Sequence, residues 1–432
     1  MAEVILMACI GALAAVMANL GIAVFNDGLR PIVPENLEGR MSRKELGVTA
    51  FAMSFGLVIG FGIPISIAGS IILIHSILLG TDIIGLAFSR GKINSVLAGA
   101  AGALYGAGIY YGLQVVVDAF AMLPLNFAEG FNKIGEPVVV SFMVFPAIAV
   151  ALQFGIKKGI LTFIVAAIAR QLIVFANTDK LISINGTQVV LSPEGIALII
   201  GMIFLIAFAV REKSDEKNLS ALAALFTERV SKIKKYVWVL MISGGLVAAA
   251  TSQLLIAGDP ISLNLLSEGK IAEGGIASLA KAIGFVPLIA STAIATGVYG
   301  PVGFTFVFGA GIFSPNPFIA AILGAVIILV EVMILTQLAK VLDRYPGIRA
   351  SGENIRTAMT RVLEVALLIG GANAANAIVP GLGFFAIAGI YLLNEAAGRP
   401  IVRMAVGPVG AIAVGIIGNI LVLLGLYVPP AG

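Results

Sequence analysis

The feature that most constrains this fold is the recurrence of long apolar segments, separated by short stretches that hold most of the charges. Of the 432 residues, 59% are hydrophobic and 12% are charged, whereas an ordinary soluble domain is about 25% charged. A soluble domain of this length buries only about three quarters of the surface that its unfolded chain exposes, so it cannot hide this much apolar surface. The composition therefore excludes a soluble globular enzyme and predicts a protein embedded in a lipid bilayer.

A helix needs about 20 apolar residues to cross the hydrocarbon core of a bilayer. By this criterion the sequence predicts an all-α polytopic membrane protein with about 14 transmembrane segments, in a range of roughly 10 to 14. Glycine and proline interrupt residues 46–88 and 276–314, and each of these stretches is either a pair of crossings or a re-entrant hairpin. The first apolar segment lacks the basic start and the cleavage site of a signal peptide, so we expect it to remain a membrane helix.

Most of the 27 Lys and Arg residues lie in loops that a fourteen-span topology places on one side of the membrane. Basic loops stay in the cytoplasm, which predicts that both termini face the periplasm or the exterior. In this topology Lys281 lies near an outer helix end. The net charge of +4 is therefore explained by topology, and we expect no nucleic-acid partner.

Two loops resemble each other and suggest an internal repeat: VFNDGLRPIVPENLEGRMSRKELG after the first apolar segment, and LIAGDPISLNLLSEGKIAEGGIA after the eighth. Asp27 matches Asp259 in this comparison. Seven spans per half would give the halves opposite orientations, which predicts two inverted repeats, residues 1–210 and 236–432. The alternative is two unrelated loops that share glycine and acidic residues.

Two further segments have local signals. Residues 211–235, between the halves, place apolar side chains at helical spacing, which predicts a cytoplasmic amphipathic helix. This segment is either a simple linker or a regulatory site. Alternating side chains around Asn185-Gly186 predict a small external β-hairpin.

Glycine-rich stretches that end in proline occupy matching positions in the two halves, at Gly60–Pro64 and Gly297–Pro301. Proline cannot donate the next helical hydrogen bond, and freed backbone groups at this depth must face protein or a wet cavity. Paired interruptions are typical of transporter binding sites, although close helix packing also favours such glycines. We expect the breaks to meet near mid-membrane, with the helices that restart after each proline directing amides at an anionic substrate.

The predicted substrate-binding residues cluster at these breaks and at a pair of amides one helical turn apart. Asparagines within a membrane either bind a substrate or join neighbouring helices. The set is Gly62, Pro64, Ser66, Ser70, Thr296, Gly300, Pro301, Thr305, Asn373 and Asn376.

Two titratable residues, Glu331 and His75, lie near the middle of apolar segments. A centred carboxylate costs a few kcal/mol, so Glu331 is either a proton-coupling group or a protonated carboxyl bonded to a neighbouring helix. His75 is either a proton relay or a neutral ring bonded across a helix interface. Because the chain has one histidine and one cysteine, we expect no metal site and no cofactor.

The opening through NDGLRP, the internal GFGIPIS, the run GGANAANA and the overall length resemble the YhfT family of uncharacterised bacterial inner-membrane proteins, across essentially the whole chain. The resemblance implies a location in the bacterial cytoplasmic membrane and a transporter role. It supplies no substrate and no site residues. The organisation is more loosely similar to elevator-type carriers and to the membrane components of sugar phosphotransferase systems.

The predicted function is secondary transport of a small polar, anionic solute by alternating access, in an elevator-like homodimer. The homodimer rests on analogy alone. Two alternatives remain open: the EIIC-like membrane subunit of a multicomponent or group-translocating uptake system, and an intramembrane lipid enzyme. The sequence has no GxxxxGK[ST] phosphate loop, which argues against an ATP-driven pump, and no Asp-rich motif or His cluster, which argues against an enzyme.

Overall fold

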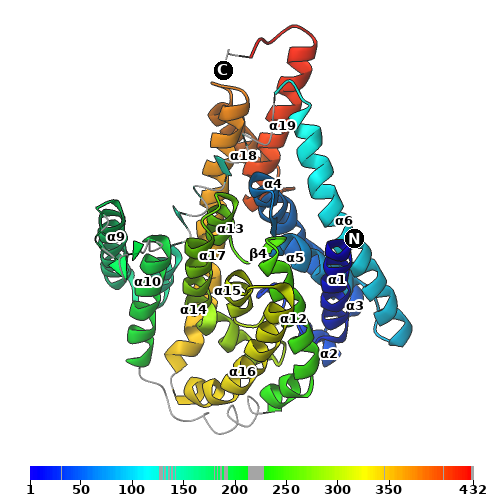
Figure 1. Cartoon of the computed structure of the whole chain (residues 1–432), viewed down its shortest axis with the longest axis vertical. Coiled ribbons are helices and arrows are strands. Elements are labelled where there is room, and N and C mark those ends of the chain that lie inside the picture. Colours follow the sequence, from blue (N-terminus) through cyan, green and yellow to red (C-terminus); the bar gives the residue numbers. More distant parts are fainter. Residues whose placement is uncertain are drawn as a thin grey trace.

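The described part of the chain is built almost entirely of helices, with two small strand pairs (Figure 1). The computed structural model describes residues 1–30, 32–125, 130, 133–134, 137, 140–141, 143–179, 181, 183–184, 187–188, 193–212, 228–344, 346–401 and 403–429. The elements of the first half are α1 (Ala2–Leu20), α2 (Ile32–Leu37), α3 (Arg43–Leu57), the π-helical η1 (Val58–Gly62), α4 (Ile63–Gly69), β1 (Ile72–Leu73), α5 (Ile74–Ala87), α6 (Lys92–Ala121), α8 (Phe145–Phe154), α9 (Ile156–Thr178), β2 (Ser183–Ile184), β3 (Thr187–Gln188) and α10 (Pro193–Val210). Those of the second half are α12 (Val237–Ser252), β4 (Ile256–Ala257), α13 (Pro260–Ser267), α14 (Ile271–Thr296), α15 (Phe306–Phe313), α16 (Pro317–Arg344), α17 (Pro346–Ile378), α18 (Gly383–Ala396) and α19 (Arg403–Leu423).

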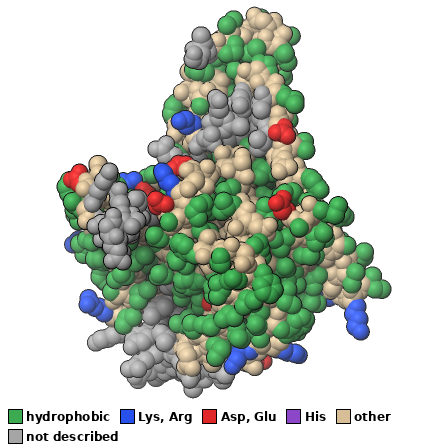
Figure 2. Space-filling view, viewed as in Figure 1, with side chains coloured by type: hydrophobic (Ala, Val, Ile, Leu, Met, Phe, Trp, Pro, Cys, Tyr) green, Lys and Arg blue, Asp and Glu red, His purple; other side chains and the backbone are tan. Residues whose placement is uncertain are grey.

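Among the described residues, seven helices are long and apolar enough to cross a membrane, or up to nine if each of two bent pairs is one span. The prediction of a helical polytopic membrane protein is confirmed at this level, whereas fourteen spans are not reached. Some apolar stretches form helices that are shorter than a full crossing: α15 has 8 residues and α18 has 14. Hydrophobic side chains gather on the lower right of the face in Figure 2, over α12 and α16, as contact with lipid requires.

Glycine determines how the helices of each half pack. On α1 and α6, a Cβ atom at either Gly11 or Gly102 would collide with the other residue's carbonyl. On α12 and α16, a Cβ atom at Gly324 would collide with the carbonyl of Gly244. Small residues let membrane helices approach backbone to backbone, so these glycines bring the two helix pairs into close contact.

The two halves are joined by backbone pairing across the middle of the molecule. Strand β1 pairs in parallel with β4, with Ile72 opposite Ile256. Ala23 forms a parallel bridge with Tyr299, and the Val24 amide donates to the Tyr299 carbonyl at 2.9 Å. Each half therefore contributes a short extended segment to the other, directly after its first helix.

The predicted helix break at Pro64 is wrong. The chain continues from α3 through η1 into α4, with Pro64 in the first turn of α4. A π-helical segment shifts the hydrogen bonds by one residue, and Pro64, which has no amide proton to donate, lies directly after this shift. The helix ends instead at Ser70, which adopts the left-handed conformation with a φ of 53°.

The second predicted break is present. Helix α14 ends at Gly297, with a φ of 69°, and α15 begins at Phe306. Between them the chain forms a non-helical loop that contains the bridge at Tyr299 and two further residues of positive φ, Gly303 and Thr305. We refer to residues 297–305 as the break loop.

The remaining elements flank this centre. The strand pairing of the predicted hairpin is confirmed, since β2 and β3 pair antiparallel with Ser183 opposite Gln188, while the predicted turn at residues 185–186 lies outside the described residues. Figure 1 shows α9 and α10 at one side, and α18 and α19 at the end where the C-terminus lies. The predicted amphipathic linker helix lies mostly outside the described residues.

Candidate functional site

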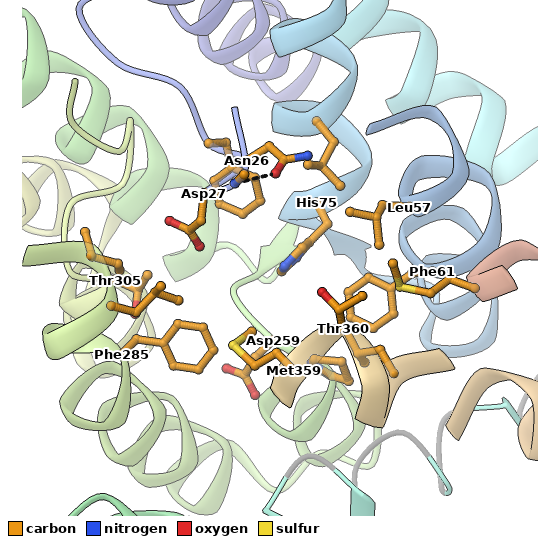
Figure 3. A pocket seen from close by; sticks show the side chains of 18 of the residues that line it. Asn26, Asp27, Leu57, Phe61, His75, Asp259, Phe285, Thr305, Met359 and Thr360 are labelled. Atoms are coloured by element: carbon orange, nitrogen blue, oxygen red, sulfur yellow. Dashed lines mark hydrogen bonds between the residues drawn. The ribbon is translucent and has the colours of Figure 1, made fainter. Parts of the chain in front are cut away.

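A cavity of about 520 Å³ lies where the two halves meet, a size typical of small-molecule sites. In Figure 3 the labelled side chains surround one space, with Asp27 and Thr305 on one side, Leu57 and Phe61 on the other, and His75 between them. Residues of both halves line it, and they come from the loop after α1, from α3, η1, α5, the α12–α13 junction, α14, the break loop, α17 and the α18–α19 junction. The cavity therefore depends on the packing of the whole molecule.

An ion pair forms one corner of the cavity. Arg30 Nη1 lies 2.6 Å from Asp27 Oδ1, and the Arg30 side chain is almost fully buried. Arg30 also donates to the Val24 carbonyl at 3.0 Å and to Thr292 Oγ1 on α14 at 2.8 Å. This arginine joins the first loop to the second half and has its charge neutralised by Asp27.

A buried carboxylate on α5 binds the backbone of the loop that follows α1. Asp82 on α5 accepts hydrogen bonds from the backbone amides of Phe25 at 3.1 Å and Asn26 at 2.8 Å. Asn26 in turn donates its side-chain amide to Ser54 Oγ at 3.0 Å. These bonds fix the direction in which Phe25 and Asp27 project into the cavity.

Asp259 occupies the corresponding place after α12. It is the N-cap of α13 and accepts from the Ser262 amide at 2.9 Å and from Ser262 Oγ at 2.7 Å. Asp27 and Asp259, which the loop comparison matched, therefore line the same cavity. Lys281 on α14 also lines it, is 6% exposed, and donates to the Gly258 carbonyl at 3.3 Å.

Aromatic side chains enclose His75. The edges of Phe25 and Phe61 meet its ring, with centroid separations of 4.9 and 5.1 Å. The buried Nδ1 atom of His75 has no hydrogen-bond partner in the described structure. His75 thus presents an unsatisfied nitrogen within an otherwise apolar part of the cavity.

The break loop is tied to α16 by Glu331. Glu331 Oε2 accepts from the Tyr299 hydroxyl at 3.0 Å and from the Phe304 amide at 2.7 Å, while the buried Oε1 has no partner among the described residues. Glu331 does not line the cavity itself. It holds in place the loop that brings Gly303 and Thr305 to the cavity wall.

Charged residues at the α18–α19 junction form another part of the wall. Glu395 receives hydrogen bonds from Arg399 at 3.0 Å and from Arg403 at 2.9 Å. Arg403 also lies 4.0 Å from Glu364 on α17. These ion pairs neutralise both arginines that line the cavity here.

Of the predicted substrate residues, the structure brings only Thr305 to the cavity, together with His75 from the predicted coupling pair. Gly62 packs closely on Ser76, and Gly300 packs on Arg30. Ser66 accepts from the Leu73 amide at 2.8 Å and donates to the Gly62 carbonyl, which stabilises the turn after α4.

The other predicted residues have local contacts. Thr296 Oγ1 donates to the Thr292 carbonyl, and the Pro301 carbonyl accepts from Ser243 Oγ. Asn376 Oδ1 accepts from the Gly381 amide after α17, Asn373 is half-buried on the same helix, and Ser70 is exposed. Pro64 is buried within α4. Roles in binding for these residues remain predictions.

Seven charged residues that line the cavity were absent from the predicted site: Asp27, Arg30, Asp259, Lys281, Glu364, Arg399 and Arg403. The repeat of Asp27 and Asp259 was a signal for two of them. The placement of Lys281 near a helix end was wrong, because α14 begins at Ile271 and ten residues of helix span about 15 Å. Among the described residues, no group of three or more His, Cys, Asp and Glu side chains is placed to hold a metal ion.

Comparisons with known proteins agree with the sequence resemblance. A family described as YhfT, a protein of unknown function, matches residues 3–427. The uncharacterised protein YhfT of Escherichia coli (strain K12) is 37% identical over 443 aligned residues, which cover 99% of this chain and 99% of that protein. No solved structure matches the chain significantly. The match to both the family and this relative spans nearly every residue, and the chain therefore belongs to the YhfT family.

Proposed function

We propose that the chain is a secondary carrier, rather than an enzyme, and that the cavity is the binding site for a small polar solute. The observation that carries this proposal is the position of the cavity where residues of the two halves meet. Carriers place their substrate at the interface of internal repeats, where one half can move against the other.

Several contacts support a pseudo-twofold relation between the halves. Gly11 and Gly102 join α1 to α6, as Gly244 and Gly324 join α12 to α16. After each first helix an extended segment pairs with the opposite half, at Ala23 with Tyr299 and at Ile256 with Ile72. In this proposal the halves are inverted repeats related by an axis in the membrane plane. Superposing residues 1–121 on residues 237–344 in an experimental structure tests the relation.

We further propose that transport is coupled to proton movement through Glu331 or His75. Glu331 bonds to the break loop at Tyr299 and Phe304, so a change in its charge would alter the hydrogen bonds that position Thr305. His75 has the unsatisfied Nδ1 described above. Alternating access requires such a link between the site and a moving segment.

We also propose a membrane location and an oligomeric state for the carrier. The basic loops favour a bacterial cytoplasmic membrane location with both termini in the periplasm. A homodimer would provide the fixed scaffold that an elevator-like movement needs, and this part rests on analogy with other carriers.

Accessibility of the cavity from both sides of the membrane tests the carrier directly. The chain has a single cysteine, the exposed Cys9, so Cys9→Ser provides a cysteine-free background. Met359→Cys places a thiol in the cavity wall, and Glu38→Cys places a control thiol on an exposed loop. A membrane-impermeant maleimide is applied to right-side-out and inside-out vesicles.

We expect the Met359→Cys thiol to react from both sides and the Glu38→Cys thiol from one side only. Labelling of the cavity thiol from a single side under every condition would contradict alternating access. An open pore would also give labelling from both sides, so the purified protein is tested for ionic conductance in a planar bilayer, which a carrier should not show.

A further inference from the structure

Lys281 is a buried cation in the cavity wall that makes no direct contact with a carboxylate of the described residues. Its side chain is 6% exposed, and its Nζ atom makes one hydrogen bond, to the Gly258 carbonyl at 3.3 Å, which is long for this type of bond. The ammonium also lies 4.8 Å from the ring centroid of Phe285 and 5.9 Å from that of Phe308. No carboxylate of the described residues lies within 4.0 Å of it. Asp259 and Asp27, which line the same cavity, attract its charge only from farther away.

Each of the other cations that line the cavity contacts a carboxylate directly. Arg30 pairs with Asp27 at 2.6 Å, and Arg399 and Arg403 pair with Glu395 at 3.0 and 2.9 Å. A buried charge is costly unless an opposite charge and hydrogen bonds compensate it, and an ammonium group has three protons to donate. Among the described residues, Lys281 is thus the cavity cation that no carboxylate contacts directly.

Two further polar groups in the same wall are unsatisfied. Thr305 is 4% exposed, and its hydroxyl has no hydrogen-bond partner in the described structure. Its φ of 79° is one that a β-branched residue rarely adopts, and such strain is often retained at functional sites. The second unsatisfied polar group is the buried Nδ1 atom of His75. Both residues line the cavity with Lys281.

We propose that Lys281 binds the carboxylate or phosphate group of a small organic anion, and that Thr305 and His75 hydrogen-bond to its remaining polar groups. Phe25, Phe61 and Phe285 provide apolar walls for its carbon skeleton. This inference rests on the proposed function in taking the cavity as the substrate site. It adds the chemical class of the solute and the residue that recognises its charge.

The first test needs no ligand. Removing a buried charge that no opposite charge contacts directly should stabilise the empty protein, whereas removing one member of a close buried ion pair should destabilise it. In purified full-length protein we expect Lys281→Met to raise the melting temperature by several degrees and Arg30→Met to lower it. If Lys281→Met lowers the melting temperature as much as Arg30→Met does, Lys281 is structural and the assignment is overturned.

The second test measures binding with matched pairs of probes that differ in charge. Lactate is compared with lactamide, and glycerol 3-phosphate with glycerol, by their effects on thermal stability, because a ligand that binds only the folded state raises it. We expect at least one anion to stabilise the wild type while its neutral counterpart does not. The pair that responds distinguishes a carboxylate from a phosphate ligand.

Variants then assign the contacts. Lys281→Met should raise the Kd of the active anion at least tenfold, and Thr305→Ser, which keeps the hydroxyl, should bind it better than Thr305→Ala. Equal stabilisation by the neutral counterpart, an unchanged Kd in Lys281→Met, or no stabilisation by any anion of the panel overturns the proposal.

Different results would contradict the carrier function and the anion site at Lys281. Binding of an anion that depends on Lys281, combined with labelling of the cavity from one side only, supports the anion site and removes the carrier. Labelling from both sides without any dependence on Lys281 supports the carrier and removes the anion site.

Discussion

Tyr299 donates its hydroxyl to Glu331 Oε2 over 3.0 Å, and both side chains are buried. The same oxygen accepts from the Phe304 amide at 2.7 Å. One carboxyl group of α16 therefore binds two residues of the break loop. The last residue of that loop, Thr305, lines the cavity. The contact links a group that can lose or gain a proton to the wall of the proposed binding site.

Replacing Glu331 separates its proton chemistry from its structural role. Glu331→Gln retains an oxygen acceptor but cannot ionise, so we expect it to fold and to lose proton-driven accumulation of solute in vesicles. Glu331→Leu leaves two buried donors without an acceptor, which costs roughly 1–3 kcal/mol for each, and should lower the melting temperature. Unchanged accumulation by Glu331→Gln would show that Glu331 acts only through structure.

His75 is the rival coupling residue and is tested in the same vesicles. His75→Asn keeps a side chain that can hydrogen-bond but removes the titratable ring. If His75 carries the proton, this variant loses proton-driven accumulation while solute exchange without a proton gradient continues. Equal losses of accumulation and exchange would instead indicate a role in binding.

Because α1 packs closely on α6, we expect a single added methyl group at this contact to lower the stability of the protein. Gly102→Ala introduces a Cβ atom against the Gly11 carbonyl, and such overpacking costs roughly 1–3 kcal/mol. Gly112, on the same helix, has open space around its Cα, so Gly112→Ala should be neutral or should stabilise the helix by up to about 1 kcal/mol. Thermal unfolding of both variants in one detergent provides the comparison.

An exposed ion pair between Glu35 of α2 and Arg40 of the following loop should make the stability depend slightly on pH. The hydrogen bond from Arg40 lowers the pKa of Glu35. A carboxyl with a lowered folded-state pKa stabilises the protein above its unfolded value of about 4.3, and this contribution is lost as the pH falls through the folded-state value. The difference in melting temperature between wild type and Glu35→Gln should therefore be present at pH 7 and disappear in acid. High salt should also reduce it, since both side chains are exposed; a difference that grows in acid would contradict the assignment.

The sequence predicted the membrane class and the second helix break because both depend on local composition. It also matched Asp27 with Asp259, which the structure places in one cavity. The first break was predicted wrongly at Pro64, since a sequence rule for proline does not foresee a π-helical turn that accommodates it. Lys281 was missed because its significance depends on its burial in the cavity wall away from any directly contacting carboxylate, which residue spacing does not encode.

The backbone pairing between the halves also affects how the protein is made. Ala23 and β1 belong to the part of the chain that a ribosome synthesises first, yet their partners, Tyr299 and β4, lie more than 180 residues further along. Until those residues are inserted into the bilayer, the extended segments of the first half have unpaired amides and carbonyls in a medium that cannot solvate them. The amino-terminal half is therefore expected to be a client of membrane chaperones during translation, and messages truncated near codon 212 should yield products that quality-control proteases remove.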